Sequence, residues 1–512
     1  MKDNRIMSEK IKILPDDEYN RTLLSRAHPP EWENPEPASR YNLVVMGAGT
    51  AGLVTAMGAA TMGARVALVE KHLMGGDCLN TGCVPSKAVI RSARVVGEIW
   101  HAADFGIKAE NCAQADFPEV MERMRRLRAQ ISQNDSAQRY RDAGVDVFLG
   151  EGRFIDRRSL EVGGKILRFK KAVITTGARP FHPPIEGLDE AGFVTSDTVF
   201  SLTERPNCLA VIGGGPIGCE LSQAFRRLGS EVTIIQRGPQ FLPREDPDAA
   251  MLLGKVLEKE GIRCLLGSDI KRVTVENGKK VVHVVYKGKE EKVEADEILV
   301  GTGRVPNVDG LNLEAAGVEY DSRKGVHVNK YFQTTNRRIY AAGDICFSYQ
   351  FTHIAEAAAR IVIQNALFLR SKKHNSMVIP WCTYTDPEIA HVGMYEKDAQ
   401  EKGIPVDTFV HYFKDVDRAV LDGEDAGFIK VHVKKGKDKI LGATIVASHA
   451  GEMISEFTLA MTTGKGLKTL VNVIHPYPTQ TDAIKRVSSQ YYAQKFSPFL
   501  KKVLTRWFAW RR

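Results

Sequence analysis

The sequence predicts an α/β protein with two interleaved domains built on parallel sheets, followed by a smaller C-terminal α+β domain. The first observation is that an apolar strand, a glycine-rich turn and a helix follow one another twice in the chain, first from residue 43 and then from residue 208. The second is that strand patterns dominate from about residue 379, with a helix from about Glu452. At roughly 150 residues per domain, 512 residues suffice for about three domains.

The composition is that of a globular protein. Hydrophobic residues make up 43% and charged residues 26%, values that argue against a disordered or fibrous chain. No apolar run reaches the ~20 residues of a membrane-spanning helix, and the polar first 40 residues lack the apolar core of a signal peptide. Eight cysteines are too few for a secreted disulfide framework, so we expect a reducing, cytoplasmic location.

The excess of positive charge is confined to the C-terminal end. The chain has a net charge of +9. Eight basic residues and no acidic residue follow Asp482, so the rest of the chain has a net charge of only +1. A near-neutral body with one basic end argues against nucleic-acid binding. From Phe499 onward apolar residues recur at helical spacing, with Trp507 and Trp510 among them. This helix could lie on an anionic membrane through residues 497–512, or it could pack on its own dimer with its charges facing water.

The first glycine-rich turn has the context of a dinucleotide-binding fingerprint. It follows the strand at 43–46 and precedes an Ala-rich helix, and the next strand, at 65–69, ends at Glu70. Such glycines permit a tight turn, a close approach to a diphosphate and close packing of helix on strand. The carboxylate after the second strand can accept a hydrogen bond from a ribose hydroxyl. The three glycines are Gly47, Gly49 and Gly52.

The second turn repeats this pattern with one difference. Its strands are 208–212 and 231–235, but the next residues are Gln236 and Arg237 in place of a carboxylate. A neutral side chain with a guanidinium suits the 2′-phosphate of NADPH, by charge and by bidentate geometry. The alternative is that Arg237 only faces water in a loop. The glycines of this turn are Gly213, Gly215 and Gly218.

Two cysteines lie five residues apart in the segment 75–87. On an ideal helix Cys78 and Cys83 would be separated by about 7.5 Å of rise, beyond the ~4.4–6.8 Å between Cα atoms that a disulfide tolerates. The turn must therefore be distorted, which Gly82 and Pro85 permit, and a strained cross-link is easily reduced. The spacing alone leaves a redox-active pair, a metal site and two unrelated cysteines open.

Together, the two fingerprints, the cysteine pair and the Ala-Ala-Gly-Asp segment ending at Asp344 resemble the pyridine-nucleotide-disulfide oxidoreductases. These include dihydrolipoamide dehydrogenases, glutathione reductases and mercuric reductases, and the resemblance covers about residues 41–490. It implies Rossmann-like domains that bind FAD at the first fingerprint and the pyridine nucleotide at the second, in a homodimer with shared active sites. Beyond the fingerprint residues, the expected cofactor contacts are Thr176, Gly177, Gly303 and Asp344.

The resemblance also implies catalytic roles. Cys78 would be the interchange thiol that meets the substrate, and Cys83 the thiol against the flavin. Lys87 and Glu220 would form the ion pair beside the flavin. A helix N-terminus and a nearby lysine lower the pKa of a thiol, so we expect an activated thiolate in this pair. Asp77, where the family commonly has threonine, should raise the pKa of Cys78, discourage anionic substrates, or simply cap the helix that follows.

The C-terminal segment departs from the disulfide reductases, whose His-Pro-Thr segment supplies an acid/base histidine to the partner subunit. Aligning on the Pro-Thr dipeptide puts Tyr477 at that position, with His475 two residues away as a further candidate. A phenol with a pKa of about 10 is a poor general base, and Tyr477 could instead pack at the interface. Tyrosine is what mercuric reductases have here, yet no cysteine follows Cys382, so their C-terminal cysteine pair is missing.

We therefore expect an FAD enzyme that passes electrons from NADPH through FAD and the cysteine pair to a disulfide, a metal ion or a related small acceptor. Alternatives are a quinone-type reductase that works at the flavin, a dihydrolipoamide dehydrogenase-like enzyme, or a membrane-docked protein with negligible turnover. We expect no resident metal. The expected parts are an N-terminal extension (1–40), an FAD-binding domain (41–183 and 309–378), an NAD(P)-binding domain (184–308), a dimerisation domain (379–490) and a basic amphipathic tail (491–512).

Overall fold

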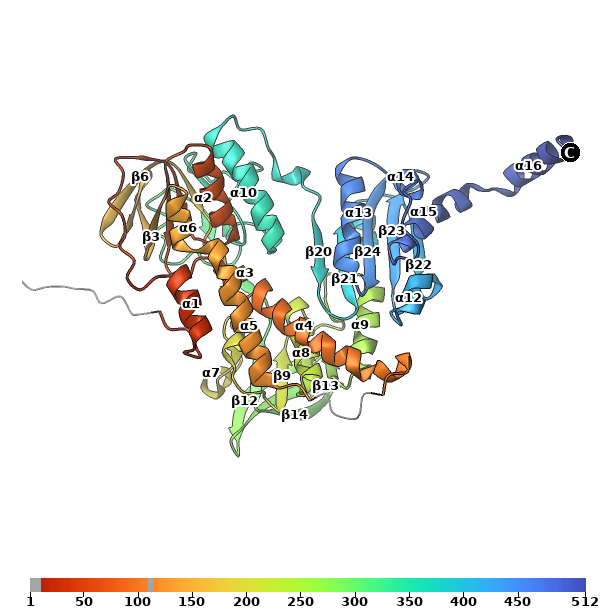
Figure 1. Cartoon of the computed structure of the whole chain (residues 1–512), viewed down its shortest axis with the longest axis horizontal. Coiled ribbons are helices and arrows are strands. Elements are labelled where there is room, and N and C mark those ends of the chain that lie inside the picture. Colours follow the sequence, from red (N-terminus) through yellow and green to blue (C-terminus); the bar gives the residue numbers. More distant parts are fainter. Residues whose placement is uncertain (1–10, 109–113) are drawn as a thin grey trace, which may run out of the picture. The chain divides into compact units, whose positions relative to one another are not determined.

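The structure is a computed structural model of the whole chain, and it describes residues 11–108 and 114–512 (Figure 1). The first ten residues of the predicted N-terminal extension lie outside this part. The described residues form two compact units: 11–100, 114–239 and 260–376 make the first, and 101–108, 240–259 and 377–512 make the second. The predicted domain bounds divide the first unit further, and they stay a prediction.

The first unit contains a sheet whose central strands are all parallel (Figure 1). β3, β2, β1 and β6 follow one another in space, β19 also pairs with β6, and β5 and β4 continue from β6 as antiparallel strands. Helices α2 (Thr50–Thr61) and α10 (Thr352–Leu367) pack against each other. The order 3-2-1 is that of a Rossmann-like sheet. The strands are β1 (Tyr41–Met46), β2 (Val66–Glu70), β3 (Val145–Leu149), β4 (Gly152–Asp156), β5 (Ser159–Val162), β6 (Lys165–Ile174) and β19 (Ile339–Ala341).

A second parallel sheet in the same unit repeats this arrangement. Its order is β11-β10-β9-β15-β8, and a three-stranded antiparallel sheet, β12-β13-β14, accompanies it. The α/β fold is therefore as predicted. The strands are β8 (Val194–Thr195), β9 (Cys208–Ile212), β10 (Glu231–Gln236), β11 (Arg263–Leu266), β12 (Asp269–Glu276), β13 (Lys279–Tyr286), β14 (Lys289–Ala295) and β15 (Glu297–Val300). Two short pairs complete the unit: β7 (Ala178–Pro180) with β16 (Arg304–Pro306), and β17 (Tyr320–Asp321) with β18 (Gly325–Val326).

The second unit is built on an antiparallel sheet of order β20-β21-β24-β23-β22. Helices pack on it around a core that includes Ile445, Phe457 and Ile484. Its strands are β20 (Pro380–Thr383), β21 (Glu388–Gly393), β22 (Val406–Tyr412), β23 (Phe428–Lys434) and β24 (Ile440–Ala447). Its helices are α9 (Pro247–Lys259), α11 (Glu396–Glu401), α12 (Asp417–Leu421), α13 (Ala450–Thr462), α14 (Leu467–Val471), α15 (Asp482–Lys495) and α16 (Pro498–Trp510). Among the described residues, no helix is long and apolar enough to cross a membrane.

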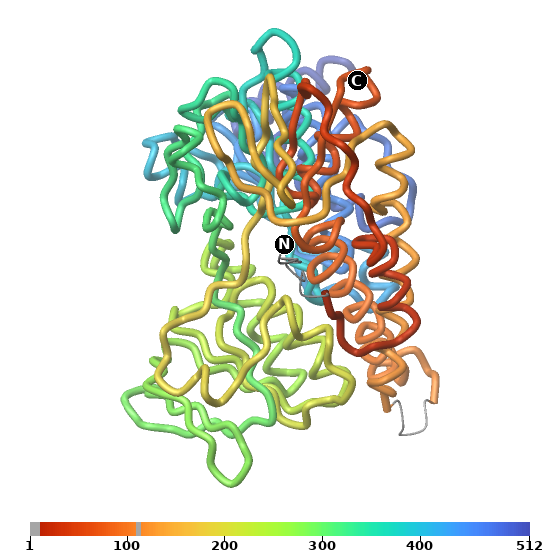
Figure 2. Tube along the Cα trace, turned by 90° about the vertical axis from the view of Figure 1, so that its left-hand side faces the viewer, coloured from red at the N-terminus to blue at the C-terminus, as the bar shows by residue number. Residues whose placement is uncertain are grey.

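The described part of the N-terminal extension packs on the first unit, where α1 runs beside α5 (Figure 2). On α5, Arg125 forms an ion pair with Asp17, and Arg128 Nη2 donates to Asn20 Oδ1 at 2.6 Å. Arg128 Nη1 also donates to the carbonyl oxygen of Asn80, at 2.7 Å. The extension is thus connected through Arg128 to the segment that carries the cysteine pair. Besides α2 and α10, the first unit contains the helices α1 (Glu18–Ala27), α4 (Cys83–Trp100), α5 (Phe117–Ile131), α6 (Ala137–Asp142), α7 (Leu188–Ala191) and α8 (Pro216–Arg227).

Two positions of the first glycine-rich turn tolerate no side chain. Gly47 has a φ of +104°, and a Cβ on Gly52 would lie 1.8 Å from the carbonyl oxygen of Gly47. Gly49 is different, because its Cβ would meet only the Cα of Gly76, at the ordinary distance of 3.7 Å. Gly52 is therefore needed for the packing of α2 on β1, while the position of Gly49 has room for a methyl group beside Gly76.

Gly52→Ala is expected to destabilise the chain by about 3 kcal/mol or more, because the backbone of the turn has to move to admit the methyl group. Gly49→Ala is the matched control, and it should change the free energy of unfolding by less than about 1 kcal/mol. Urea unfolding of the ligand-free variants, followed by circular dichroism, measures both. Equal losses in the two variants would contradict this account of the turn.

Candidate active site

Cys78 and Cys83 lie on two different helices. Cys78 belongs to α3 (Gly76–Asn80), and Cys83 is the first residue of α4. A Cβ on Gly82 would lie 2.8 Å from a carbonyl oxygen of the preceding turn, so glycine fits the break between the helices. Pro85 lies in the first turn of α4, where a missing N–H leaves no helical hydrogen bond unmade. The break brings the two thiols into hydrogen-bonding contact.

The two thiols differ in proton affinity. The pKa of Cys83 is lowered to about 6, first by the hydrogen bond from Cys78 and then by the hydroxyl of Thr352 and the charge of Lys87. The hydrogen bond to Cys83, together with burial, raises the pKa of Cys78. Thr352 Oγ1, which the sequence analysis did not single out, lies 3.3 Å from Cys83 Sγ. In the reduced pair the negative charge therefore resides on Cys83 and the proton on Cys78.

Lys87 and Glu220 form an ion pair between α4 and α8. Lys87 Nζ lies 2.8 Å from Glu220 Oε2, and the Glu220 side chain is 8% exposed. Lys87 follows Cys83 by four residues on one helix, so the two side chains share a face. The ammonium is thus held on the side of the helix where the Cys83 thiolate needs a compensating charge.

The turn expected to bind the flavin is formed and leads into the N-terminus of α2, where the extended Gly49 is the cap residue. Glu70, at the end of β2, accepts from Ala48 N at 2.6 Å and from His72 N at 2.7 Å. A free helix N-terminus suits a diphosphate, and a carboxylate held at this place suits a ribose. The helix N-terminus at Gly49 and the carboxylate of Glu70 therefore fit the dinucleotide part of FAD.

A second segment holds the same turn from the other side. Thr175 Oγ1 donates to the carbonyl oxygen of Gly47 at 2.8 Å, a role that sequence reasoning missed. The expected contact residues Thr176 and Gly177 follow it, and Thr176 Oγ1 donates to the carbonyl oxygen of Asn307 at 2.9 Å. Gly177 has a φ of +66°. The segment lies beside the first glycine-rich turn, where its hydroxyl groups hold the backbone, and its contact with FAD stays a prediction.

The second glycine-rich turn has the geometry of the first. A Cβ on Gly218 would lie 1.9 Å from the carbonyl oxygen of Gly213, while a Cβ on Gly215 would meet nothing closer than 4.0 Å. Gln236 Oε1 accepts from Gly214 N at 2.8 Å, as Glu70 does from Ala48 N in the first turn. Arg237, at the end of β10, is exposed. Gly303 lies farther along the chain with a φ of +121° and open space beside its Cα.

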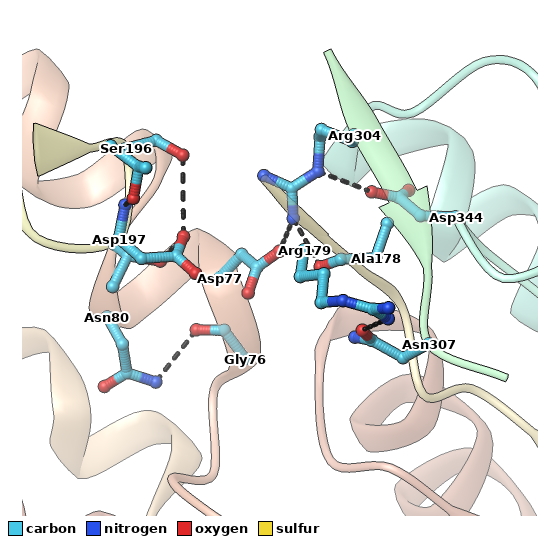
Figure 3. A network of polar contacts seen from close by, with 12 residues as sticks. Gly76, Asp77, Asn80, Ala178, Arg179, Ser196, Asp197, Arg304, Asn307 and Asp344 are labelled. Carbon is cyan, nitrogen blue, oxygen red and sulfur yellow. Dashed lines mark hydrogen bonds and ion pairs between the residues drawn. The ribbon is translucent and has the colours of Figure 1, made fainter. Parts of the chain in front are cut away.

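Arg304 lies between the carboxylates of Asp77 and Asp344 (Figure 3). It forms an ion pair with Asp77, donates to the carbonyl oxygen of Ala178 at 2.6 Å, and has its Nε 3.8 Å from Asp344 Oδ2. Asp77 is the second residue of α3, whose cap residue is Gly75, so it is not the helix cap. The charge of Asp77 is offset by Arg304. Burial raises the pKa of the other carboxyl group, Asp344, to about 6. In the sequence Arg304 is a lone arginine after Gly303, and no motif marks it as a partner of Asp77.

In the second unit, the C-terminal candidates have their own partners. The side chain of Tyr477 is exposed, and its hydroxyl donates to Asp417 Oδ2 at 3.0 Å. This hydrogen bond raises the pKa of Tyr477. The His475 imidazole is only 6% exposed and lies 3.1 Å from Glu456 Oε2 through its Nε2. Tyr477 is thus presented at the surface, and His475 is held within its own unit.

Two family models match the chain. The pyridine nucleotide-disulphide oxidoreductase family matches residues 41–359, and the dimerisation domain of that family matches residues 379–488. The chain belongs to the pyridine nucleotide-disulphide oxidoreductases. This confirms the predicted family and fold class, and with them an oxidoreductase that uses FAD and NAD(P)H.

The relatives of this chain within the family are named as different enzymes. A mercuric reductase from Staphylococcus aureus is 37% identical over 446 residues, which cover 87% of this chain and 81% of that protein. A dihydrolipoyl dehydrogenase from Mycoplasma pneumoniae is 33% identical over 455 residues, 87% of this chain and 97% of that protein. The solved HOCl-induced flavoprotein disulfide reductase RclA from Escherichia coli has a TM-score of 0.79 at 28% identity, covering 88% of this chain and 99% of its own. A Cu(II) complex of RclA aligns equally well, with a TM-score of 0.79.

The reduced, flavin-free protein is expected to show one thiolate that is present above pH 6 and is lost as the pH falls through about 6. The ultraviolet absorbance of thiolate, titrated against pH, measures it. Cys83→Ser should remove this step, and Cys78→Ser should move it upward, toward the ordinary thiol pKa of about 8.5, because the donated hydrogen bond is lost. A step that survives in Cys83→Ser would place the thiolate elsewhere.

Arg237→Ala is expected to raise the KM for NADPH about tenfold or more and to change the KM for NADH less than about twofold, because only NADPH carries a 2′-phosphate. Steady-state kinetics with both nucleotides give the ratio. Arg153→Ala removes the same charge from β4 of the other sheet, and it should leave the ratio unchanged. An unchanged ratio in Arg237→Ala would mean that Arg237 only faces water.

Proposed function

We propose that this chain reduces a thiophilic metal ion at Cys78 and Cys83 with electrons from NADPH. The observation that carries the proposal is that Tyr477, which the resemblance aligns with the acid/base histidine, is exposed and has its pKa raised by its hydrogen bond to Asp417. The family relationship supports the flow of electrons from NADPH to the thiol pair, and FAD, when bound, supplies that relay. The mercuric reductases among its relatives support a metal ion as the acceptor.

The proton balance favours a metal ion over a disulfide. The pKa of Cys78 is raised, so this thiol needs a base before it can attack a disulfide. A phenol whose pKa lies above about 10 does not take up that proton near neutral pH, and His475 is held by Glu456. A soft cation needs no such base, because a thiol loses its proton on coordination to a metal.

The chain's own residues have distinct roles in this proposal. Cys78 and Cys83 are soft sulfur ligands for the incoming ion. The hydrogen bond from Cys78 keeps Cys83 ionised, and the charge of Lys87, which is paired with Glu220, adds to this effect. For a divalent ion the reaction balances as M²⁺ + NADPH → M⁰ + NADP⁺ + H⁺, in which the hydride supplies both electrons and one proton is released. Among residues 11–108 and 114–512, no cluster of three His, Cys, Asp or Glu side chains could hold a metal ion, so the thiol pair itself is the proposed site.

Assembly and location complete the proposal. The dimerisation domain supports a homodimer, in which Tyr477 of one subunit would face the thiol pair of the other. The few cysteines of the chain favour a reducing compartment such as the cytoplasm, where both thiols can cycle.

NADPH consumption with mercuric ion, oxidised glutathione, lipoamide and a quinone tests the acceptor. Mercuric ion is expected to give a kcat/KM at least tenfold above the other acceptors, corresponding to about 1.4 kcal/mol in the barrier. Cys78→Ser and Cys83→Ser should each lower that value about 100-fold or more, because one soft ligand is lost. The matched control Cys208→Ser removes a thiol on β9 and should leave turnover unchanged.

Two outcomes would contradict the proposal. Quinone turnover that survives in both active-site variants would indicate a reductase that works at the flavin. Lipoamide or glutathione turnover equal to that with mercuric ion would indicate a disulfide reductase with another acid/base group.

A further inference from the structure

Helix α16 (Pro498–Trp510) exposes an apolar face that nothing in the described chain covers. Ser497 caps it by accepting from Leu500 N at 3.1 Å, and Pro498 occupies the first turn. No residue of the helix is buried, and Phe499 and Trp510 are 76% and 77% exposed. The helix lies outside both family matches, which end at residue 488. Its exposed face is therefore not part of the family fold that these two models describe.

The two faces of α16 are sharply separated by chemistry. With about 100° of rotation per residue, the large apolar side chains fall on one half of the circumference, and most of the basic side chains fall on the other. The apolar half consists of Phe499, Leu500, Val503, Leu504, Trp507, Phe508 and Trp510; the basic half contains Lys501, Lys502, Arg506 and Arg512. The remaining cation, Arg511, lies over the ring of Trp507 at 5.6 Å. No acidic residue offsets these charges.

These features select one kind of surface. We propose that α16 binds a lipid surface that carries anionic headgroups, with its apolar face in the interface and its cations toward the headgroups. Five cations without an acid complement an anionic leaflet, and amphipathic tryptophans favour the boundary between headgroup and acyl chain. The rings of Trp507 and Trp510 lie 5.4 Å apart and can enter that boundary together.

The length and stability of the helix agree with binding in the plane of the surface. Thirteen residues make a helix of about 20 Å, too short to cross the ~30 Å hydrocarbon core of a bilayer. A single helix of this length is marginal in water unless its apolar face is buried. Contact with lipid would bury that face and order the helix in one step. The docking of α16 does not depend on which acceptor the thiol pair reduces.

Co-sedimentation of the FAD-loaded full chain with vesicles tests the proposal. The partition coefficient should be at least tenfold higher on phosphatidylcholine mixed with phosphatidylglycerol than on phosphatidylcholine alone, and it should fall as salt rises. A chain that ends at Phe496 should lose this binding while keeping its NADPH oxidation, since no active-site residue is removed.

A matched pair of substitutions separates the apolar face from net charge. Val503→Asp and Thr505→Asp add the same charge to the same helix, on the apolar and the polar face respectively. We expect Val503→Asp to lower the partition coefficient about tenfold or more and Thr505→Asp to lower it less than about threefold. Circular dichroism of the two proteins, which should agree, verifies the fold.

Three results would overturn the proposal. The first is equal pelleting of the full and shortened chains on anionic vesicles. The second is equal loss of binding in Val503→Asp and Thr505→Asp. The third combines two measurements: the full chain binds no vesicles, and the chain ending at Phe496 differs from the full chain in oligomeric state by sedimentation velocity. That result would assign the apolar face of α16 to a second copy of the chain.

Discussion

The close approach of two backbones, at Gly49 and Gly76, determines where the active site lies. A Cβ on Gly76 would be 2.5 Å from the Cα of Gly49, and Gly75 N donates to the carbonyl oxygen of Ala48 at 2.9 Å. The first turn of α3 therefore packs directly on the first glycine-rich turn. Because no side chain separates the two segments, the distance from Cys78 to that turn is set by peptide geometry rather than by rotamers.

Two charged groups in and beside the cysteine pair each have a counterpart. The Cys83 thiolate has Lys87, which is itself paired with Glu220. Asp77, the residue before Cys78, has Arg304. The negative charge next to Cys78 is thus partly neutralised before it can act on that thiol or on an incoming cation. A carboxylate at this position is tolerated because a guanidinium is fixed nearby.

Most of the fold could be predicted from the sequence, because its signals are local. The strand expected at 43–46 is β1, and the helix expected from about Glu452 begins two residues earlier, at Ala450. The spacing of the cysteines called for a distorted turn, and the structure has two helices with a break between them. Periodicity, glycine positions and a five-residue interval contain enough information for such predictions.

Much of the site could not be predicted, because it consists of long-range pairs between ordinary residues. Arg304 and Asp77 are 227 positions apart, and Cys83 and Thr352 are 269 apart. Nothing in the sequence marks Glu456 as the partner of His475, so the histidine remained a candidate base until its partner was seen. Lone polar side chains acquire a role only when the fold brings them together, and one sequence does not reveal those pairs.

The contact between Arg128 and Asn80 has a consequence for how this chain is compared with shorter members of its family. A fragment that began at residue 41, where the family match starts, would keep the whole nucleotide fold but lose Asp17 and Asn20. Arg125 on α5 would then lose its ion pair with Asp17, and Arg128 would lose its hydrogen bond to Asn20 while keeping the one to the carbonyl oxygen of Asn80; the loss of a partner is costly for a buried guanidinium group. The N-terminal extension thus supports α5, and through Arg128 it supports the segment that carries Cys78. A chain shortened to begin at residue 41 would lack this support next to the cysteine pair.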